Sequence, residues 1–294
     1  MQCCASSGIA GGDDIKLKDC DDCDLVKYCS DECQNDHQSQ HEEECKKRAA
    51  KLHDELLFKQ PESSCYGDCP ICCLPLSLHP SKSIFMPCCS KRICNGCDLA
   101  NAKREVEARL LPKCLFCRKI APRTDEEFKD LLMKRVEAND PVAMCQMGPQ
   151  CVEEGDYNKA FEHWTRAATL GEAEADYQLS VMYQNGLSVE KDEKKKLHHL
   201  EKAAIAGHPH ARHNLGCYEW NKNGQVDRAV RHWIIGAKLG HDDSLRNVKD
   251  LYKDGHVSRD QFAAALRGYQ ATIEATKSPQ REEATAFKKR LAER

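Results

Sequence analysis

Apolar and small residues recur with a fixed pattern in the second half of the chain. Three stretches have Ala followed four residues later by Met or Leu and then by Gly or Ser, at 143–148, 175–180 and 211–216. A second pattern starts at Trp164, Leu200 and Trp233, 36 and then 33 residues apart, and continues with small residues and a Gly. Small residues let two helices approach closely, and a Gly ends a helix in the left-handed conformation. The pattern predicts a repeated helix–turn–helix unit, and therefore a solenoid over residues 141–272.

Shorter apolar stripes predict further helices on both sides of these repeats. Leu52, Leu56 and Leu57 lie on one face of a helix that ends before Pro61. Asp98 can cap a helix that continues through Leu110. A capping-box pattern, Thr124 with Glu127, opens a helix that we expect to carry four apolar residues inward: Phe128, Leu131, Leu132 and Val136. A final helical pair is expected within 244–270, with Phe262, Leu266 and Tyr269 facing inward.

Cysteine usage changes the interpretation of the first half of the chain. Of 20 cysteines, 17 precede residue 118, and no secretory signal or run of about 18 apolar residues accompanies them. The cysteines therefore indicate thiolate metal ligands in a reducing compartment, cytoplasmic or nuclear, and not disulfides. The net charge of −3 gives no overall attraction to nucleic acid, and we expect no membrane contact.

Four close cysteine pairs lie at growing intervals in the segment that we place at 65–122: Cys69 and Cys72, Cys88 and Cys89, Cys94 and Cys97, Cys114 and Cys117. A C-x2-C pair forms a tight turn that points both thiolates at one ion, and zinc takes four such ligands in a tetrahedron. Eight thiolates therefore predict two closed sites. Spacing alone leaves open whether the pairs alternate between the ions or follow one another in order.

The order of these pairs resembles a RING finger of the all-cysteine variety. The resemblance covers about fifty residues and includes Ile71 inside the first pair and Arg118 after the last, although Leu115 stands where the family usually has Pro. It implies an interleaved cross-brace, in which the first and third pairs share one zinc and the second and fourth pairs share the other. It also implies that Ile71 and Arg118 contact a ubiquitin-conjugating enzyme and its ubiquitin.

Residues 1–45 contain a second set of metal-ligand residues. Cys29 and Cys33 are four residues apart, as are His41 and Cys45, so each pair can lie on one helix face. The run from Tyr28 to Gln34, with the following His-x3-His-x3-Cys, resembles a MYND finger. The resemblance implies that one zinc is bound by Cys20, Cys23, His41 and Cys45, and that His37 is a packing residue.

The other MYND-type site has an incomplete ligand set. Cys4 would join Cys29 and Cys33, but Ser7 stands where the family has a second Cys, and a hydroxyl is a poor zinc ligand beside thiolates. Cys3 is an alternative fourth ligand. We therefore expect three to four zinc ions in the whole chain.

Residue patterns for catalysis are lacking in the sequence. It has no phosphate-cradling loop, no nucleophile elbow and no His-Glu-x-x-His, and we expect every zinc site to be closed to water. Two functions remain. The chain could be an adaptor whose fingers and concave repeat face bind other proteins. It could also be a RING-type ubiquitin ligase, which has no covalent catalytic residue and acts by positioning the conjugating enzyme. Nucleic-acid binding is disfavoured because the finger segments are acidic.

Together these patterns predict a mostly α-helical protein with two small zinc fingers followed by a helical repeat solenoid. The repeat pattern resembles Sel-one-like repeats, which are relatives of the tetratricopeptide class. The expected segments, in chain order, are a MYND-type finger, a helix and linker, a RING-like finger, a connecting helix, these Sel-one-like repeats, and a charged tail: 1–45, 46–64, 65–122, 123–140, 141–272 and 273–294.

Overall fold

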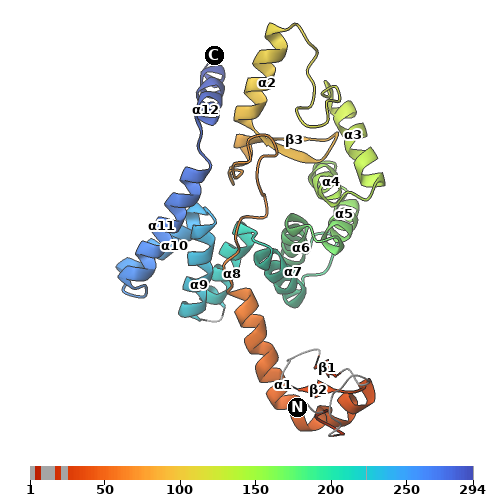
Figure 1. Ribbon diagram of the computed structural model, residues 1–294, viewed down its shortest axis with the longest axis vertical. Helices are drawn as coiled ribbons and strands as arrows, with labels where there is room; N and C mark the ends of the chain where they lie inside the picture. The colour runs from red at the N-terminus through yellow and green to blue at the C-terminus, as the bar shows by residue number, and fades with distance from the viewer. Residues whose placement is uncertain (1–3, 8–16, 21–25, 223, 294) are drawn as a thin grey trace. The chain divides into compact units, whose positions relative to one another are not determined.

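The chain divides into two compact units, residues 1–59 and residues 60–294. The computed structural model describes residues 4–7, 17–20, 26–222 and 224–293, without the side chains of residues 38–40. Among these residues helices predominate, and the named strands form two short antiparallel pairs (Figure 1). The prediction of a mostly helical chain, with cysteine-rich fingers before stacked helix pairs, is confirmed.

The first unit has a two-stranded ladder and one long helix. Strand β1 (Lys18–Asp19) pairs with β2 (Lys27–Tyr28), and α1 (Asp31–Leu57) follows directly. The Ser30 side chain caps α1 by accepting the Cys33 N–H at 3.2 Å. Helix α1 is therefore continuous from the ligand residues of the finger through the stretch with Leu52 and Leu56, for which the sequence predicted a separate helix.

The second unit begins with another small finger. The 3-10 turn η1 (Pro80–Lys82) leads into a hairpin of β3 (Ser83–Met86) and β4 (Lys91–Cys94), and α2 (Asn95–Glu107) follows. The predicted helix start at Asp98 is wrong. Cys94 occupies the N-cap position, because the turn that brings Cys94 and Cys97 together is itself the first turn of α2.

Helix α3 (Asp125–Glu137) joins this finger to the repeats. Thr124 caps it by accepting the Glu127 N–H at 3.1 Å, but the Glu127 carboxylate accepts the Arg123 N–H at 2.7 Å, so only half of the predicted capping box forms. Leu131 packs on the finger core, whereas Leu132 and Val136 are buried in the core of the first repeats. The finger and the repeats thus share one helix.

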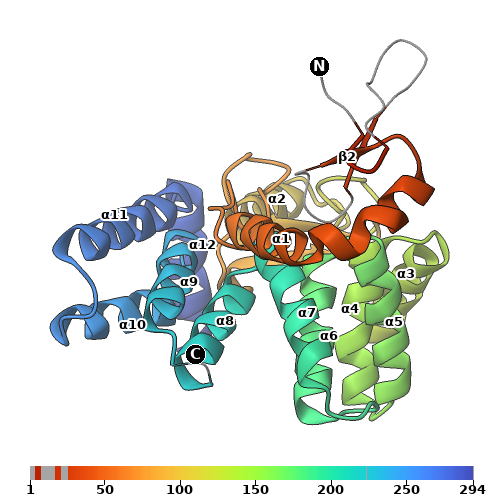
Figure 2. The ribbon, with the colours of Figure 1, turned by 90° about the horizontal axis from the view of Figure 1, so that it is seen from below.

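Stacked antiparallel helix pairs make up most of the second unit (Figure 2). Three pairs are followed by a fourth, with these bounds: α4 (Pro141–Glu153), α5 (Tyr157–Thr169), α6 (Ala173–Asn185), α7 (Glu193–Ile205), α8 (Pro209–Asn221), α9 (Val226–Lys238), α10 (Asp242–Lys253) and α11 (Arg259–Ala275). The tryptophans Trp164 and Trp233 are buried core residues, as predicted.

Close packing of each tryptophan depends on a glycine in the partner helix. A Cβ added to Gly148 would lie 2.2 Å from the Trp164 ring, and one added to Gly216 would lie 2.5 Å from the Trp233 ring. In both pairs the indole Nε1 donates to a carbonyl of the partner helix at 3.2 Å. The small residues in the repeat pattern are therefore the positions where the two helices of a pair touch.

The sequence patterns assigned no element to the last twenty residues, but the structure has a helix there. Helix α12 (Pro279–Ala292) packs against α2 of the second finger. Its Ala284 is 1% exposed. The charged C-terminal segment is therefore docked on the finger, although more than 170 residues separate the two in sequence. None of the described helices is long and apolar enough to cross a bilayer.

Candidate metal centres

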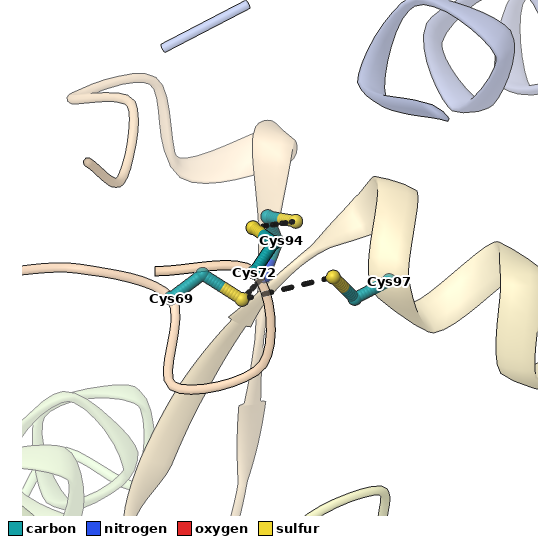
Figure 3. A group of neighbouring side chains, drawn as sticks. All are labelled: Cys69, Cys72, Cys94 and Cys97. Carbon is teal, nitrogen blue, oxygen red and sulfur yellow. Dashed lines mark hydrogen bonds between the residues drawn. The ribbon is translucent and has the colours of Figure 1, made fainter. Parts of the chain in front are cut away.

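Four cysteine sulfurs of the second finger meet between its first loop, β4 and α2 (Figure 3). Cys69 and Cys72 come from the loop, Cys94 from the end of β4 and Cys97 from the first turn of α2. The Cys69 and Cys97 Sγ atoms are 4.0 Å apart, and those of Cys72 and Cys94 are 3.8 Å apart. The first and third sequence pairs are thus brought to one point.

The second and fourth pairs meet at another point of the same finger. Cys88 and Cys89 form the turn between β3 and β4, and Cys114 and Cys117 lie in a turn closed by the bridge between Lys113 and Ile120. Sulfur distances are 3.2 Å from Cys88 to Cys117 and 3.7 Å from Cys89 to Cys114. The structure therefore has the interleaved arrangement, which spacing alone left open.

The first finger brings Cys20, His41 and Cys45 together. The Cys20 Sγ is 3.5 Å from His41 Nε2 and 3.8 Å from the Cys45 Sγ. Cys23, which the sequence pattern assigns to the same ion, lies outside the described residues. The neighbouring His37 belongs to neither ligand group. Its Nδ1 and the Tyr28 hydroxyl share a hydrogen bond of 3.1 Å, and its ring stacks on the His41 ring. It packs, as the sequence predicted.

A second ligand group of the first finger consists of Cys4, Cys29 and Cys33. The Cys29 and Cys33 Sγ atoms are 3.6 Å apart, with Cys33 in the first turn of α1 and Cys29 just before the Ser30 cap. The expectation that this pair lies on one helix face is therefore wrong, because the helix begins only at Asp31. Ser7 lies beside them, with its Oγ 3.5 Å from the Cys29 Sγ and its N–H directed at the Cys4 Sγ. The serine thus stands next to the fourth ligand position, and the described residues supply only three soft ligands; Cys3 lies outside them.

All four groups fit the dimensions of a zinc tetrahedron. With Zn–S bonds of about 2.3 Å, the sulfurs of a tetrahedral site are about 3.8 Å apart. The observed distances of 3.2–4.0 Å scatter around that value. In the second finger both groups have four thiolates, the ligand set of a closed structural site. Zinc bound by the four thiolates of either group in the second finger would hold its loops in place and would have no open position for a reacting water.

The two residues assigned to a conjugating-enzyme surface lie on the outside of the second finger. Ile71 is 42% exposed in the first loop, and Phe116, in the last ligand turn, is 48% exposed. Arg118 is exposed and has a φ of 64°, and its N–H donates to the Cys114 carbonyl at 3.0 Å. Both residues are thus exposed at the finger surface, and Arg118 also closes the last ligand turn through its backbone N–H.

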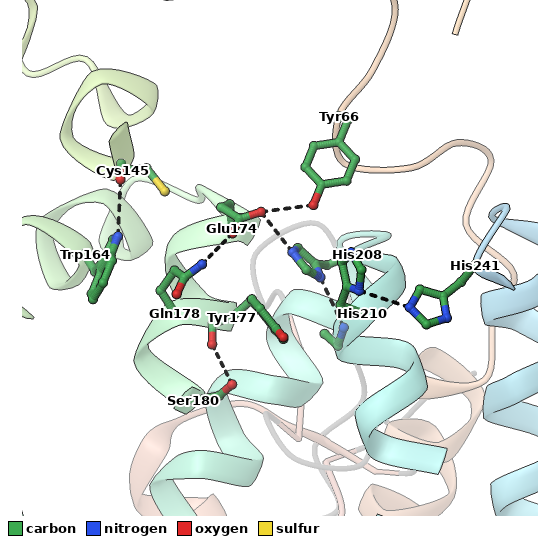
Figure 4. Close-up of polar contacts among 11 residues, drawn as sticks. Tyr66, Cys145, Trp164, Glu174, Tyr177, Gln178, Ser180, His208, His210 and His241 are labelled. Atoms are coloured by element: carbon green, nitrogen blue, oxygen red, sulfur yellow. Dashed lines mark hydrogen bonds and ion pairs between the residues drawn. The ribbon is translucent and has the colours of Figure 1, made fainter. Parts of the chain in front are cut away.

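A hydrogen-bonded cluster that the sequence patterns did not indicate joins the finger to the repeats (Figure 4). The carboxylate of Glu174, on α6, accepts from Tyr66 at 3.1 Å, from His208 at 3.1 Å and from Gln178 at 2.7 Å. Burial raises the pKa of Glu174, but these hydrogen bonds outweigh it and lower the pKa to about 2. No local pattern could have indicated the cluster, because Tyr66 and His208 are far from Glu174 in sequence.

The repeats carry a groove between the first helices of two successive pairs. It has a volume of about 700 Å³ and lies where α6 and α8 meet the start of α7. Its lining includes two aromatic, three amide and three basic side chains: Tyr183, Tyr218, Gln184, Asn214, Asn221, Lys191, Lys196 and Lys222. The Lys196 ammonium lies 4.9 Å from the centre of the Tyr218 ring, which holds this charge at the groove wall.

Comparison with known families identifies the first finger and the repeats. Residues 3–45 match the MYND finger family, and residues 141–172 and 173–208 each match the Sel1 repeat. The MYND finger and the Sel1 repeats predicted from the sequence are confirmed, and MYND fingers bind zinc. Neither match covers the second finger, whose cysteine clusters at 69–117 indicate a finger without assigning a family.

Solved structures that are similar to this chain include the following three. A Sel1 repeat protein from Oxalobacter formigenes is 23% identical over 52% of this chain and 64% of its own, with a TM-score of 0.43. A protective antigen of uropathogenic Escherichia coli with an SLR fold is 24% identical over 58% and 37%, with a TM-score of 0.41. An immunity protein from Pseudomonas aeruginosa is 18% identical over 61% and 83%, with a TM-score of 0.30. No curated protein matches the chain.

Proposed function

We propose that this protein is a zinc-stabilised scaffold whose repeat groove holds an acidic segment of another protein. MYND fingers and Sel1 repeats are protein-interaction modules, and both occur in this chain. The proposal places two zinc ions in the second finger and up to two in the first. It also places the protein in a reducing compartment, cytoplasm or nucleus, because thiolates are the ligands.

The observation that carries the groove assignment is its charge. Three lysine side chains line the groove, and the only carboxylates among the described residues of its lining are those of Asp192 and Glu193. Asp192 is already engaged, because it caps α7 by accepting the Lys195 N–H at 3.0 Å. The amide groups of Gln184, Asn214 and Asn221 add neutral donors along the same wall. A partner with several Asp or Glu residues would therefore meet ammonium and amide donors together.

Charge reversal in the groove tests this proposal. We expect a short-peptide library passed over the zinc-loaded chain to yield peptides enriched in Asp and Glu. The Lys196→Glu variant should bind those peptides about tenfold more weakly, because a like charge is placed opposite them. Lys249→Glu, an exposed change on α10 outside the groove, is the matched control. The acidic-segment assignment would be refuted if the zinc-loaded chain selected neutral or basic peptides. It would also be refuted if Lys196→Glu and Lys249→Glu bound the selected peptides equally well.

A second candidate function is ubiquitin transfer by the second finger. It is favoured by the interleaved cysteine groups together with the exposure of Ile71 and Arg118. In this hypothesis Ile71 contacts a conjugating enzyme, and Arg118 donates hydrogen bonds that hold its ubiquitin in a reactive geometry. The finger would contribute positioning and no nucleophile.

Arg118→Ala is expected to keep full zinc content and folding while slowing self-ubiquitination by about tenfold or more, because only the reactive geometry changes. Transfer would be measured with a panel of conjugating enzymes, and Arg123→Ala, also exposed, is the control. Cys94→Ser should abolish both transfer and one zinc site. A fully metallated parent that is inactive with the whole panel would exclude the ligase function and leave the binding function.

A further inference from the structure

The C-terminal helix places a guanidinium against one of the metal centres. Arg281 lies in the first turn of α12, where its N–H donates to the Ser278 cap at 3.3 Å. From there its Nη2 donates to the Cys72 Sγ at 3.3 Å and to the Leu74 carbonyl at 3.0 Å. Its Nη1 donates to the Pro75 carbonyl at 2.6 Å and to the Thr276 carbonyl at 2.8 Å. One side chain thus contacts a ligand sulfur, the ligand loop and the end of α11.

The contact between Arg281 and Cys72 brings a positive charge to a metal centre that is negatively charged when zinc is bound. Four thiolates around one Zn²⁺ leave the centre with a formal charge of about −2. Among the described backbone groups, the Cys94 N–H donates to the Cys69 Sγ at 3.4 Å. Arg281 adds a charged donor at a different sulfur, Cys72. Partners of this kind orient metal ligands, and their loss typically lowers metal affinity by about 10–100-fold.

The remaining contacts of α12 do not involve the metal centre directly. The helix start approaches Gly96 so closely that an added Cβ would lie 2.8 Å from the Arg281 backbone nitrogen. Glu283 forms an ion pair with Lys103 on α2, and Lys288 donates to the Ser81 carbonyl at 3.3 Å. Ala284 is buried in the contact. The helix therefore has one anchor at the metal centre and several along the finger surface.

We propose that Arg281 is an outer-sphere residue of the centre formed by Cys69, Cys72, Cys94 and Cys97, and that metal binding there is coupled to docking of α12. Metal bound by the four thiolates fixes the Cys72 sulfur and the neighbouring carbonyls of Leu74 and Pro75, to which Arg281 donates hydrogen bonds. Docked α12 in turn holds those groups in the geometry that retains the metal. Such a coupling is reciprocal, so undocking α12 must weaken metal binding by the same factor by which metal loss weakens docking.

Zinc release from the full-length chain tests the first half of this inference. We expect Arg281→Ala to release one zinc ion to a chromogenic chelator at least about tenfold faster than the parent, with the other ions unaffected. Cysteine alkylation read by mass spectrometry identifies the ion, since Cys72 and its three partners should become reactive first. Arg281→Lys keeps the positive charge but loses the planar set of guanidinium donors, so its zinc-release rate should lie between those of the parent and Arg281→Ala. Arg290→Ala, an exposed change at the other end of α12, should match the parent.

Ala284→Asp tests the second half, because it weakens the α12 contact and leaves Arg281 in place. Hydrogen exchange in residues 279–292 should rise in this variant, and release of the same ion should also become faster. The inference rests on the proposed zinc binding, so the metal content of the parent is measured first. A parent without metal in this group would refute that zinc binding. If Arg281→Ala releases zinc at the parental rate, the role of Arg281 is refuted. If zinc release is unchanged although α12 is undocked in Ala284→Asp, the coupling between docking and metal binding is refuted.

Discussion

Removal of zinc from the intact chain is expected to unfold both fingers and to leave the repeats α4–α11 folded. Each structural zinc site contributes about 10–16 kcal/mol of apparent binding free energy in finger peptides. The apolar core of the second finger consists mainly of its ligand cysteines with Leu76, Met86 and Ile93. A core of this size cannot replace the contribution of the metal. The repeats have their own apolar cores, which contain no member of a metal-ligand group.

Segment-resolved hydrogen exchange with and without a strong chelator would measure this difference. Exchange should rise sharply in the described parts of residues 4–57 and in 65–122, and α12 should lose protection with the second finger. Most of the helical circular dichroism should remain. Metal analysis of the untreated protein should give three to four zinc ions per chain. Two or fewer ions in a fully folded protein, or loss of most of the helical signal on chelation, would contradict the proposed sites.

Gly148→Ala is expected to destabilise the second unit by about 1–3 kcal/mol, although Ala is normally the better helix residue. In an exposed helix interior the same change would stabilise by about 0.5–1 kcal/mol. At position 148 the new methyl group would lie 2.2–2.5 Å from three atoms of the Trp164 ring. Trp164 is 4% exposed and is held by its hydrogen bond to the Cys145 carbonyl, so relief requires the helices α4 and α5 to separate.

Urea denaturation of the zinc-loaded chain would measure this effect, with Gly268→Ala as the matched control. A Cβ at position 268 would also meet a side chain closely, at 2.6 Å from the Lys238 Cγ, but that atom belongs to a half-buried lysine side chain that can change rotamer, and not to a rigid buried ring. The control should therefore be neutral or slightly stabilising. A Gly148→Ala protein as stable as the parent would show that the tryptophan can shift within its core. The same comparison applies to Gly216 and Trp233, which repeat the arrangement two helix pairs later, in α8 and α9.

The chemistry of the ligand residues could be predicted from the sequence because it is local. Two cysteines separated by two residues face one ion whatever surrounds them, so the ligand types of both fingers followed from spacing. The helix pairs were equally accessible, since Trp164, Leu200 and Trp233 repeat at the length of one helix–turn–helix unit. Helix ends were less predictable. The start of α2 was misplaced because a ligand turn, and not a capping Asp, begins the helix.

The sequence by itself determined the types and spacing of the candidate metal ligands and which faces of the repeat helices are buried, since both depend on neighbours within one or two turns. Only the tertiary structure decided which cysteine pairs share an ion, because the β3–β4 hairpin carries Cys88 and Cys89 away from Cys94. It also decided that Glu174 binds Tyr66 and His208, and that Arg281 reaches Cys72 across more than 200 residues of chain. Contacts of this kind leave no periodic trace in a sequence, because their partners meet only after the intervening elements have packed.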